Sequence, residues 1–230
     1  MRVLGLVPAR GGSRGVPRKN LRLLGGRPLL AYTAEAALAA ATLARVVLST
    51  DDDEIAEVGR ALGLAVPFLR PAELAADATP TLPVVAHALA ALREGGERFD
   101  AVCLLQPTSP LRGPGEIDDC VALLERTGAD CVMTVHAVPH AYHPDWVWLG
   151  EPAAALRLAT GRSSPVPRRQ ELAPAWHRSG SVYVTQTRVV DGGSLYGDRV
   201  LGVPVPVDRS VNLDTLADFD RAEALLRADG

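Results

Sequence analysis

The chain has 230 residues, of which 47% are hydrophobic and 4% aromatic, and its formal net charge is −3. This length suits a single sizeable core, and the lack of a basic stripe with stacking aromatics favours a small anionic ligand over a nucleic-acid partner. No signal peptide or membrane-spanning run is apparent, so we expect a cytoplasmic protein with no membrane partner. Cys103, Cys120 and Cys131 lack the spacing of a metal site or redox pair, so we expect reduced thiols.

The first predicted element is a buried strand from Val3 to Val7, and the loop after Pro8 is rich in glycine and basic residues. No acidic residue occurs before Glu35, so this loop is locally cationic. Glycine lets backbone N–H groups approach a phosphate, and basic side chains add charge-assisted hydrogen bonds. The loop matches neither the P-loop nor the dinucleotide-binding fingerprint, so its residues alone leave two interpretations, an anion site or a solvated basic turn.

Strands and helices then alternate along the chain. The predicted elements are a helix at 28–41, a strand at 45–50, a helix at 55–63, a strand at 64–69, a helix at 84–92, a strand at 101–105, a helix at 116–125 and a strand at 130–135. This alternation is typical of a parallel sheet with right-handed crossovers, whose polar loops meet at one edge. Asp51, Asp52 and Asp53 precede the second helix, where they suit capping better than metal binding.

The alternation breaks at Val138, where several prolines interrupt the chain and Trp146 and Trp148 have no obvious packing partner. A strand at 181–185 follows, and then an edge strand or extended segment at 200–207, which contains two prolines. The last predicted helix covers 215–227, with Asp214 as its N-cap. The whole pattern predicts an α/β protein with an open, mostly parallel sheet flanked by helices.

The stretch from Pro8 to Leu21, Pro-Ala-Arg-Gly-Gly-Ser-Arg-Gly-Val-Pro-Arg-Lys-Asn-Leu, resembles the signature loop of the CMP-sialic acid synthetase (acylneuraminate cytidylyltransferase) family, which activates sialic acid and related nonulosonates as CMP-sugars. Three later stretches strengthen the resemblance: Ser49 to Asp52, Arg70 to Ala75 with Asp77, and Leu105 to Arg112. The resemblance implies a fold like that of nucleotide-diphospho-sugar transferases. It also implies one domain over residues 1–230, a dimerisation segment inserted at 138–175, and a homodimer.

The activity that the resemblance implies is the transfer of CMP from CTP to the anomeric hydroxyl of an acidic keto-sugar, with Mg²⁺ as cofactor and pyrophosphate as the second product. Two alternatives remain open. One is CTP-dependent activation of another anionic acceptor, such as a Kdo-like sugar or a phosphonate. The other is a nucleotide-binding protein of the same fold without turnover.

The resemblance also implies roles for individual residues. Lys19, Arg10 and Asp214 would be catalytic. CTP would contact Arg10, Gly11, Gly12, Ser13, Arg14, Lys19, Arg70 and Asp77. The acceptor would contact Gln106 and Arg178, and Mg²⁺ would bind Asp214 and Asn212.

The chain departs from the family pattern at three of its positions. Arg14 stands where lysine is usual, Ser179 replaces an asparagine near the acceptor, and Asn212 replaces the first of two aspartates. An amide oxygen can bind Mg²⁺ but brings no charge. Two structural alternatives also stay open: Arg70 as a surface residue before a proline, and Asp214 as a simple N-cap.

Overall fold

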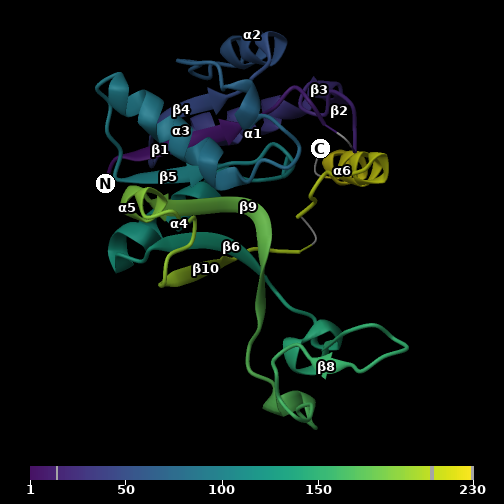
Figure 1. Cartoon of the computed structure of the whole chain (residues 1–230). Coiled ribbons are helices and arrows are strands. Elements are labelled where there is room, and N and C mark those ends of the chain that lie inside the picture. The colour runs from purple at the N-terminus through teal and green to yellow at the C-terminus, as the bar shows by residue number, and fades with distance from the viewer. Residues whose placement is uncertain (14, 208–209, 229–230) are drawn as a thin grey trace.

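The computed structural model describes residues 1–13, 15–207 and 210–228. A six-stranded sheet, ordered β10-β6-β9-β5-β1-β4, forms the centre of the molecule (Figure 1). Its strands are β1 (Val3–Pro8), β4 (Leu43–Ser49), β5 (Ala101–Leu104), β6 (Cys131–Ala137), β9 (Trp176–Gln186) and β10 (Val200–Pro204). β1 runs parallel to β4 and β5, and β10 runs parallel to β6, whereas β9 is antiparallel to both of its neighbours. The predicted open, mostly parallel sheet is confirmed.

Helices cover both faces of this sheet, as the alternating side chains of β1 require. Val3 and Val7 belong to a core with α1 and α4, whereas Leu4 and Leu6 belong to a second core with α3 and α5. The helices are α1 (Leu29–Ala39), α2 (Asp53–Ala61), α3 (Thr81–Glu94), α4 (Pro114–Thr127), α5 (Thr187–Asp191) and α6 (Leu216–Ala228). Because the strand is buried on both sides, its sequence is apolar without interruption.

The C-terminal segment returns to the start of the chain. Leu213 and Phe219 pack with Val16, Leu24 and Leu29 in a third core, beside the small hairpin of β2 (Leu23–Leu24) and β3 (Arg27–Pro28). This packing brings residues 211–214 next to the basic loop after β1.

Two predicted elements differ from the structure. The strand expected at 64–69 is wrong, because only Ala65 bridges to Val47, and Pro67 lacks the N–H that a continued ladder needs. The predicted N-cap of the last helix is also wrong. The helix begins at Leu216, and the Thr215 hydroxyl accepts the Asp218 N–H at 3.4 Å, one residue later than expected. By contrast, the prediction of a cap before α2 is confirmed, because Asp52 accepts the Ile55 N–H at 2.9 Å.

Residues 138–175, which we call the arm, connect β6 to β9 and project from the body on these two strands (Figure 1). The arm contains η2 (His140–Tyr142), η3 (Pro144–Trp146), β7 (Trp148–Leu149), β8 (Arg157–Leu158) and η4 (Arg169–Glu171). Trp146 packs within it and donates its indole N–H to the Val166 carbonyl at 2.7 Å. Tyr142, Trp148 and, at the start of β9, Trp176 remain 72%, 48% and 51% exposed. The arm therefore leaves several aromatic side chains uncovered.

In the described part of the chain, no helix has the length and apolar character needed to cross a membrane.

Candidate active site

The basic loop between β1 and α1 is held closed at its base. The Asn20 amide donates to the Arg10 carbonyl at 2.9 Å, and the Gly11 N–H donates to Asp51 at the end of β4 at 3.1 Å. Two glycines of the loop lie too close to neighbouring atoms to carry a side chain. A Cβ at Gly11 would lie 2.6 Å from the Asp52 carboxylate, and a Cβ at Gly15 would clash with the Asp214 carbonyl. The loop thus sits between the end of β4 and the C-terminal segment.

A cavity of about 360 Å³, which we call the loop pocket, lies at this edge of the sheet. Its lining contains the following predicted site residues: Arg10, Gly12, Ser13, Lys19, Arg70, Asp77, Gln106, Asn212 and Asp214. Gly11 belongs to the loop but not to the lining, and the prediction for Arg14 lies outside the described residues. The structure therefore brings together predicted residues from four separate stretches of the chain.

Lys19 points into the loop pocket and is the only lysine among the 24 Lys and Arg residues of the chain. Its ammonium donates to the Leu213 carbonyl at 2.8 Å and lies 3.3 Å from the Asp214 carboxylate. Arg10 pairs with Asp77 at 2.8 Å in the same pocket. The carboxylate of Asp214 thus faces Lys19 and is not the helix cap, so the alternative of a simple N-cap does not hold.

Arg70 is buried, with only 4% of its side chain exposed, so the alternative of a surface residue is wrong. Its guanidinium lies 3.5 Å from Asp51, and its Nε has no hydrogen-bond partner within the described ranges. Burial lowers the pKa of Arg70, although the nearby Asp51 carboxylate opposes this shift. A buried guanidinium in the wall of a pocket is well suited to hydrogen-bond a ligand there.

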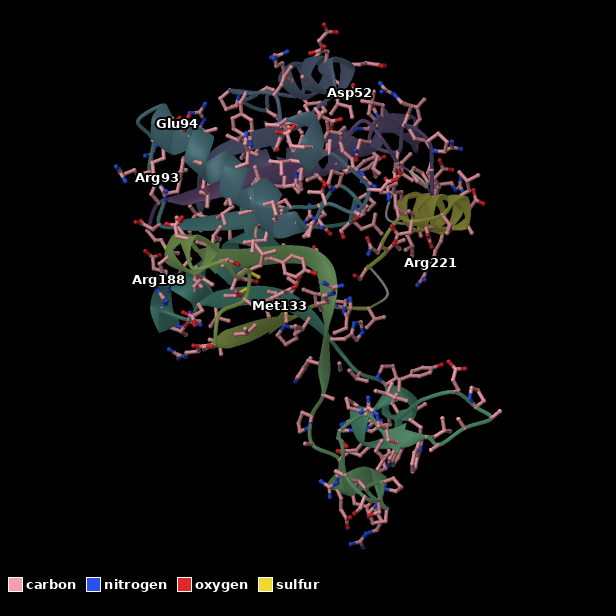
Figure 2. The ribbon with its side chains drawn as sticks, in the orientation of Figure 1. Asp52, Arg93, Glu94, Met133, Arg188 and Arg221 are labelled. Carbon is pink, nitrogen blue, oxygen red and sulfur yellow. The ribbon has the colours of Figure 1, made fainter. Side chains whose placement is uncertain are left out.

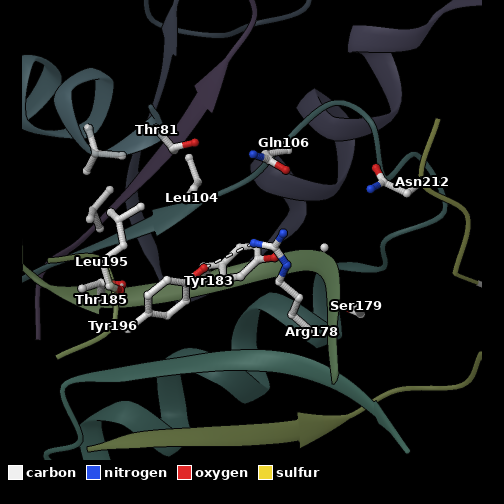
Figure 3. Close-up of a pocket in the computed structure, with 13 residues that line it drawn as sticks. Thr81, Leu104, Gln106, Arg178, Ser179, Tyr183, Thr185, Leu195, Tyr196 and Asn212 are labelled. Carbon is white, nitrogen blue, oxygen red and sulfur yellow. Dashed lines mark hydrogen bonds between the residues drawn. The ribbon is translucent and has the colours of Figure 1, made fainter. Parts of the chain in front are cut away.

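A second cavity of about 290 Å³, which we call the tyrosine pocket, adjoins the loop pocket and shares Thr81, Gln106 and Asn212 with it (Figure 3). Arg178 donates to the Tyr196 hydroxyl at 3.5 Å, and this hydrogen bond raises the pKa of Arg178. The ring centres of Tyr196 and Tyr183 lie 6.4 Å apart. The lining also contains the aliphatic side chains Val85, Val102, Leu104 and Leu195.

Gly180, in the lining of this pocket, is the residue at which the backbone of β9 departs from ordinary strand geometry. Its φ of +88° is a backbone conformation that favours glycine, and the register between β6 and β9 shifts between Met133 and Val135. Arg178 and Ser179, just before this glycine, line the tyrosine pocket. The predicted acceptor residues Gln106 and Arg178 therefore line one cavity, Gln106 just after the end of β5 and Arg178 on β9.

The oxygens available for a metal ion are few. Asn212 and Asp214 both line the loop pocket, and the Asp214 side chain is 70% exposed. Within the described residues, no group of three His, Cys, Asp or Glu side chains could hold a metal alone. One carboxylate and one amide oxygen fit a Mg²⁺ ion that takes its remaining ligands from phosphates and water.

The sequence did not assign a site role to Arg112, which is buried and has no carboxylate bound to its guanidinium among the described residues. It donates to the carbonyls of Ser181 and Gln106, at 2.8 and 2.9 Å, and to the Thr33 hydroxyl at 3.3 Å. Burial lowers the pKa of Arg112 to about 10. Arg112 thus ties the backbone of Gln106, which lines the tyrosine pocket, to that of Ser181, which follows the lining residue Gly180. Only its position after Gln106 in the resembling stretch could have drawn attention to it.

Comparison with known proteins gives concordant results. A family model described as Cytidylyltransferase matches residues 4–156. A CMP-N,N'-diacetyllegionaminic acid synthase of Legionella pneumophila is 31% identical over 229 residues, which cover 98% of this chain and 97% of that protein. An N-acylneuraminate cytidylyltransferase A of Danio rerio is 30% identical over 95% of this chain, but the match spans only 49% of that longer protein.

A solved structure of CMP:2-keto-3-deoxy-manno-octonic acid synthetase in complex with CTP has a TM-score of 0.74 with this chain, at 19% identity and with 100% of both chains covered. At that identity the likeness concerns the fold. The family model matches well over half of the chain, and the Legionella relative matches almost all of it. This chain belongs to the cytidylyltransferase family.

Proposed function

We propose that this protein transfers CMP from CTP to the anomeric hydroxyl of a sialic-acid-like nonulosonate and releases pyrophosphate. One observation supports this most directly: a cationic pocket and an arginine-tyrosine pocket adjoin and share Thr81, Gln106 and Asn212. Transfer between two substrates needs such adjacency, because the nucleophile must approach the α-phosphorus in line with the leaving group. The named relatives act on legionaminic and neuraminic acids, which agrees with an acidic acceptor.

In this proposal CTP occupies the loop pocket. Lys19 and Arg10 bind the triphosphate, and Lys19 donates to the charge that develops as the bond to pyrophosphate breaks. To do so, both cations exchange their present partners, Asp214 and Asp77, for phosphate oxygens. The guanidinium of Arg70, in the wall of this pocket, donates to the cytosine ring.

The acceptor occupies the tyrosine pocket. Arg178 binds its carboxylate, and Gln106 orients the sugar toward the shared boundary with the loop pocket. The anomeric oxygen then forms the new bond to the α-phosphorus, the bond between that phosphorus and the bridging oxygen breaks, and the hydroxyl proton is lost to solvent. The aliphatic residues in the pocket lining suit an apolar substituent of the sugar.

Mg²⁺ is the proposed cofactor, held by Asp214 and Asn212 together with the triphosphate. The ion would supply positive charge that stabilises the leaving pyrophosphate. Because one carboxylate alone binds Mg²⁺ weakly, we expect CTP and the metal to enter together.

The proposed assembly is a homodimer formed through the arm. Exposed aromatic side chains such as Tyr142 and Trp148 are enriched at protein interfaces, and they gather here on a segment that projects from the body. We also expect a cytoplasmic location, since the three cysteines are buried and unpaired.

Pyrophosphate release tests the proposal. The purified protein is given CTP, Mg²⁺ and one acceptor at a time: a sialic acid, a di-N-acetylated legionaminic acid, Kdo, and a phosphonate. Arg188 pairs with Asp130 at 2.5 Å and lines neither pocket, so Arg188→Ala is the control. Turnover with a nonulosonate, lost in Arg178→Ala but kept in Arg188→Ala, supports the proposal. Turnover with Kdo or the phosphonate alone favours the other acceptor class, and CTP binding without turnover on the whole panel favours a non-enzyme.

A further inference from the structure

Arg18 is the one non-glycine residue with a positive φ, +54°, within residues 1–13, 15–207 and 210–228. Side chains with a Cβ rarely adopt this left-handed conformation, so surrounding contacts must hold it. The Arg18 carbonyl accepts the N–H groups of Leu21 and Arg22 at 2.9 and 3.0 Å, which begins the turn that leads to α1. The strained backbone therefore lies at the point where the basic loop ends.

Two carboxylates hold the Arg18 side chain. Its guanidinium pairs with Asp52 at 2.5 Å and also with Glu54. Asp52 stands at the N-terminus of α2 (Figure 2), where it also accepts the Ile55 N–H. Burial would raise the pKa of Asp52, but the Ile55 N–H and Arg18 outweigh it and lower that pKa, so the carboxylate is ionised at neutral pH.

The same carboxylate touches the other limb of the loop. Asp52 packs against the Cα of Gly11, leaving no room for a Cβ, and neighbouring Asp51 accepts the Gly11 N–H. The first turn of α2 thus contacts the loop near its beginning and near its end. A shift of Asp52 would move both limbs together.

Arg18 and Lys19 point to opposite sides. Arg18 is not part of the loop-pocket lining, whereas Lys19 lines that pocket and reaches Leu213 and Asp214. Because Arg18 and Lys19 are adjacent in the chain, the ion pairs that hold the Arg18 backbone also set the direction of the Lys19 side chain.

We propose that Arg18, through its ion pairs with Asp52 and Glu54, is a positioning residue that aims the Lys19 ammonium at the triphosphate. The inference rests on the proposed function only in that CTP is the ligand of the loop pocket. Arg18 itself does not touch the ligand.

The test uses the fact that Lys19 is the only lysine. Lysine labelled with ¹³C and ¹⁵N in its side chain gives a single side-chain signal in an NMR spectrum, which reports Lys19 directly. Arg18→Asn removes the ion pairs but tolerates a positive φ. We expect it to shift and broaden that signal, to weaken CTP binding about fivefold and to lower kcat about tenfold, with the acceptor KM unchanged.

Three controls make the test specific. Arg93→Gln removes a guanidinium of similar exposure that pairs with Asp191 at 3.1 Å, and it should change none of these measurements. Asp52→Asn keeps the helix cap and should have the same effects on the lysine signal, CTP binding and kcat as Arg18→Asn. It therefore provides the test if Arg18→Asn does not fold. In a Lys19→Ala background, Arg18→Asn should add less than a further twofold loss of turnover, since residues acting as one unit are not additive.

An unmoved lysine signal with wild-type CTP affinity in both Arg18→Asn and Asp52→Asn overturns the inference. The inference is also overturned if the variants melt at a lower temperature but keep the wild-type CTP affinity and kcat, because Arg18 would then have a purely structural role. NMR and CTP binding need no acceptor. If the wild-type protein does not bind CTP at all, the proposed function fails instead.

Discussion

Replacing Lys19 with alanine separates catalysis from stability. The substitution loses one hydrogen bond to the Leu213 carbonyl, a contribution of about 1 kcal/mol, and an ion pair with the 70% exposed Asp214, a contribution of about 0–1 kcal/mol. For a chain of this size, each kcal/mol lowers the melting temperature by roughly 2–4 °C, so the expected decrease is about 2–8 °C. Loss of a donor to developing charge costs about 2.7–4 kcal/mol of barrier, or a roughly 100- to 1,000-fold lower kcat.

The assay is pyrophosphate release at saturating CTP, Mg²⁺ and acceptor, at a temperature well below the melting point of the variant. Lys19→Arg keeps the charge and should retain more activity than Lys19→Ala. A folded Lys19→Ala protein with kcat within threefold of the wild type would refute the phosphate role of this loop.

Four further predictions concern other parts of the molecule. Arg70→Ala should weaken CTP binding and reduce discrimination against UTP, whereas unchanged binding constants for both nucleotides would remove this residue from the base site. Asp214→Asn should nearly abolish turnover across a Mg²⁺ titration and Asn212→Asp should tighten metal binding, whereas a wild-type curve for Asp214→Asn contradicts the metal assignment. Replacing both Tyr142 and Trp148 with serine should yield monomers with reduced activity, and sedimentation of a wild-type monomer at micromolar concentration contradicts the proposed dimer. Burial would raise the pKa of Asp118, but hydrogen bonds from Thr42 and Ala41 outweigh it and lower the pKa below the ordinary value of 3.8. The stabilising contribution of Asp118 is therefore present above 3.8 and is lost as the pH falls through the depressed pKa of the folded state. Asp118→Asn should lessen the loss of melting temperature in acid, whereas a melting temperature with the same pH dependence as that of the wild type contradicts this.

The sheet and its ligand edge could be predicted because the responsible signals are local. A strand without polar residues, such as Val3 to Val7, indicates that both of its faces are buried, and the structure buries both. The carboxyl ends of parallel strands meet at one edge, so Lys19 and Gln106, although distant in sequence, could be expected in one place. Both line the loop pocket.

The tyrosine pocket depends on tertiary structure that no local pattern specifies. Strand β9 is antiparallel and lies between β5 and β6, and a buried strand has the same apolar sequence in either direction. Tyr183 and Tyr196 were therefore not expected at the site. Arg112 was missed for a related reason: an arginine is expected at the surface, and only the folded chain supplies the three acceptors that let it be buried.

The departures at Ser179 and Asn212 also take their meaning from the structure. Ser179 exchanges a hydrogen bond of 2.6 Å with the buried Thr134 hydroxyl, so its side chain supports the bend in β9. Asn212 lines both pockets, so in the proposed mechanism it is placed to contact either substrate as well as the metal. Sequence alone suggested only the second of these roles.

The central claim is that the anomeric oxygen of a nonulosonate attacks the α-phosphorus of CTP. The most direct measurement uses an acceptor labelled with ¹⁸O at the anomeric position and follows the reaction with CTP and Mg²⁺ by ³¹P NMR. The account predicts a CMP-sugar whose phosphorus signal carries the ¹⁸O isotope shift, formed in equal amount with unlabelled pyrophosphate. A CMP product without the isotope shift, or no CMP-sugar from any nonulosonate, would contradict it.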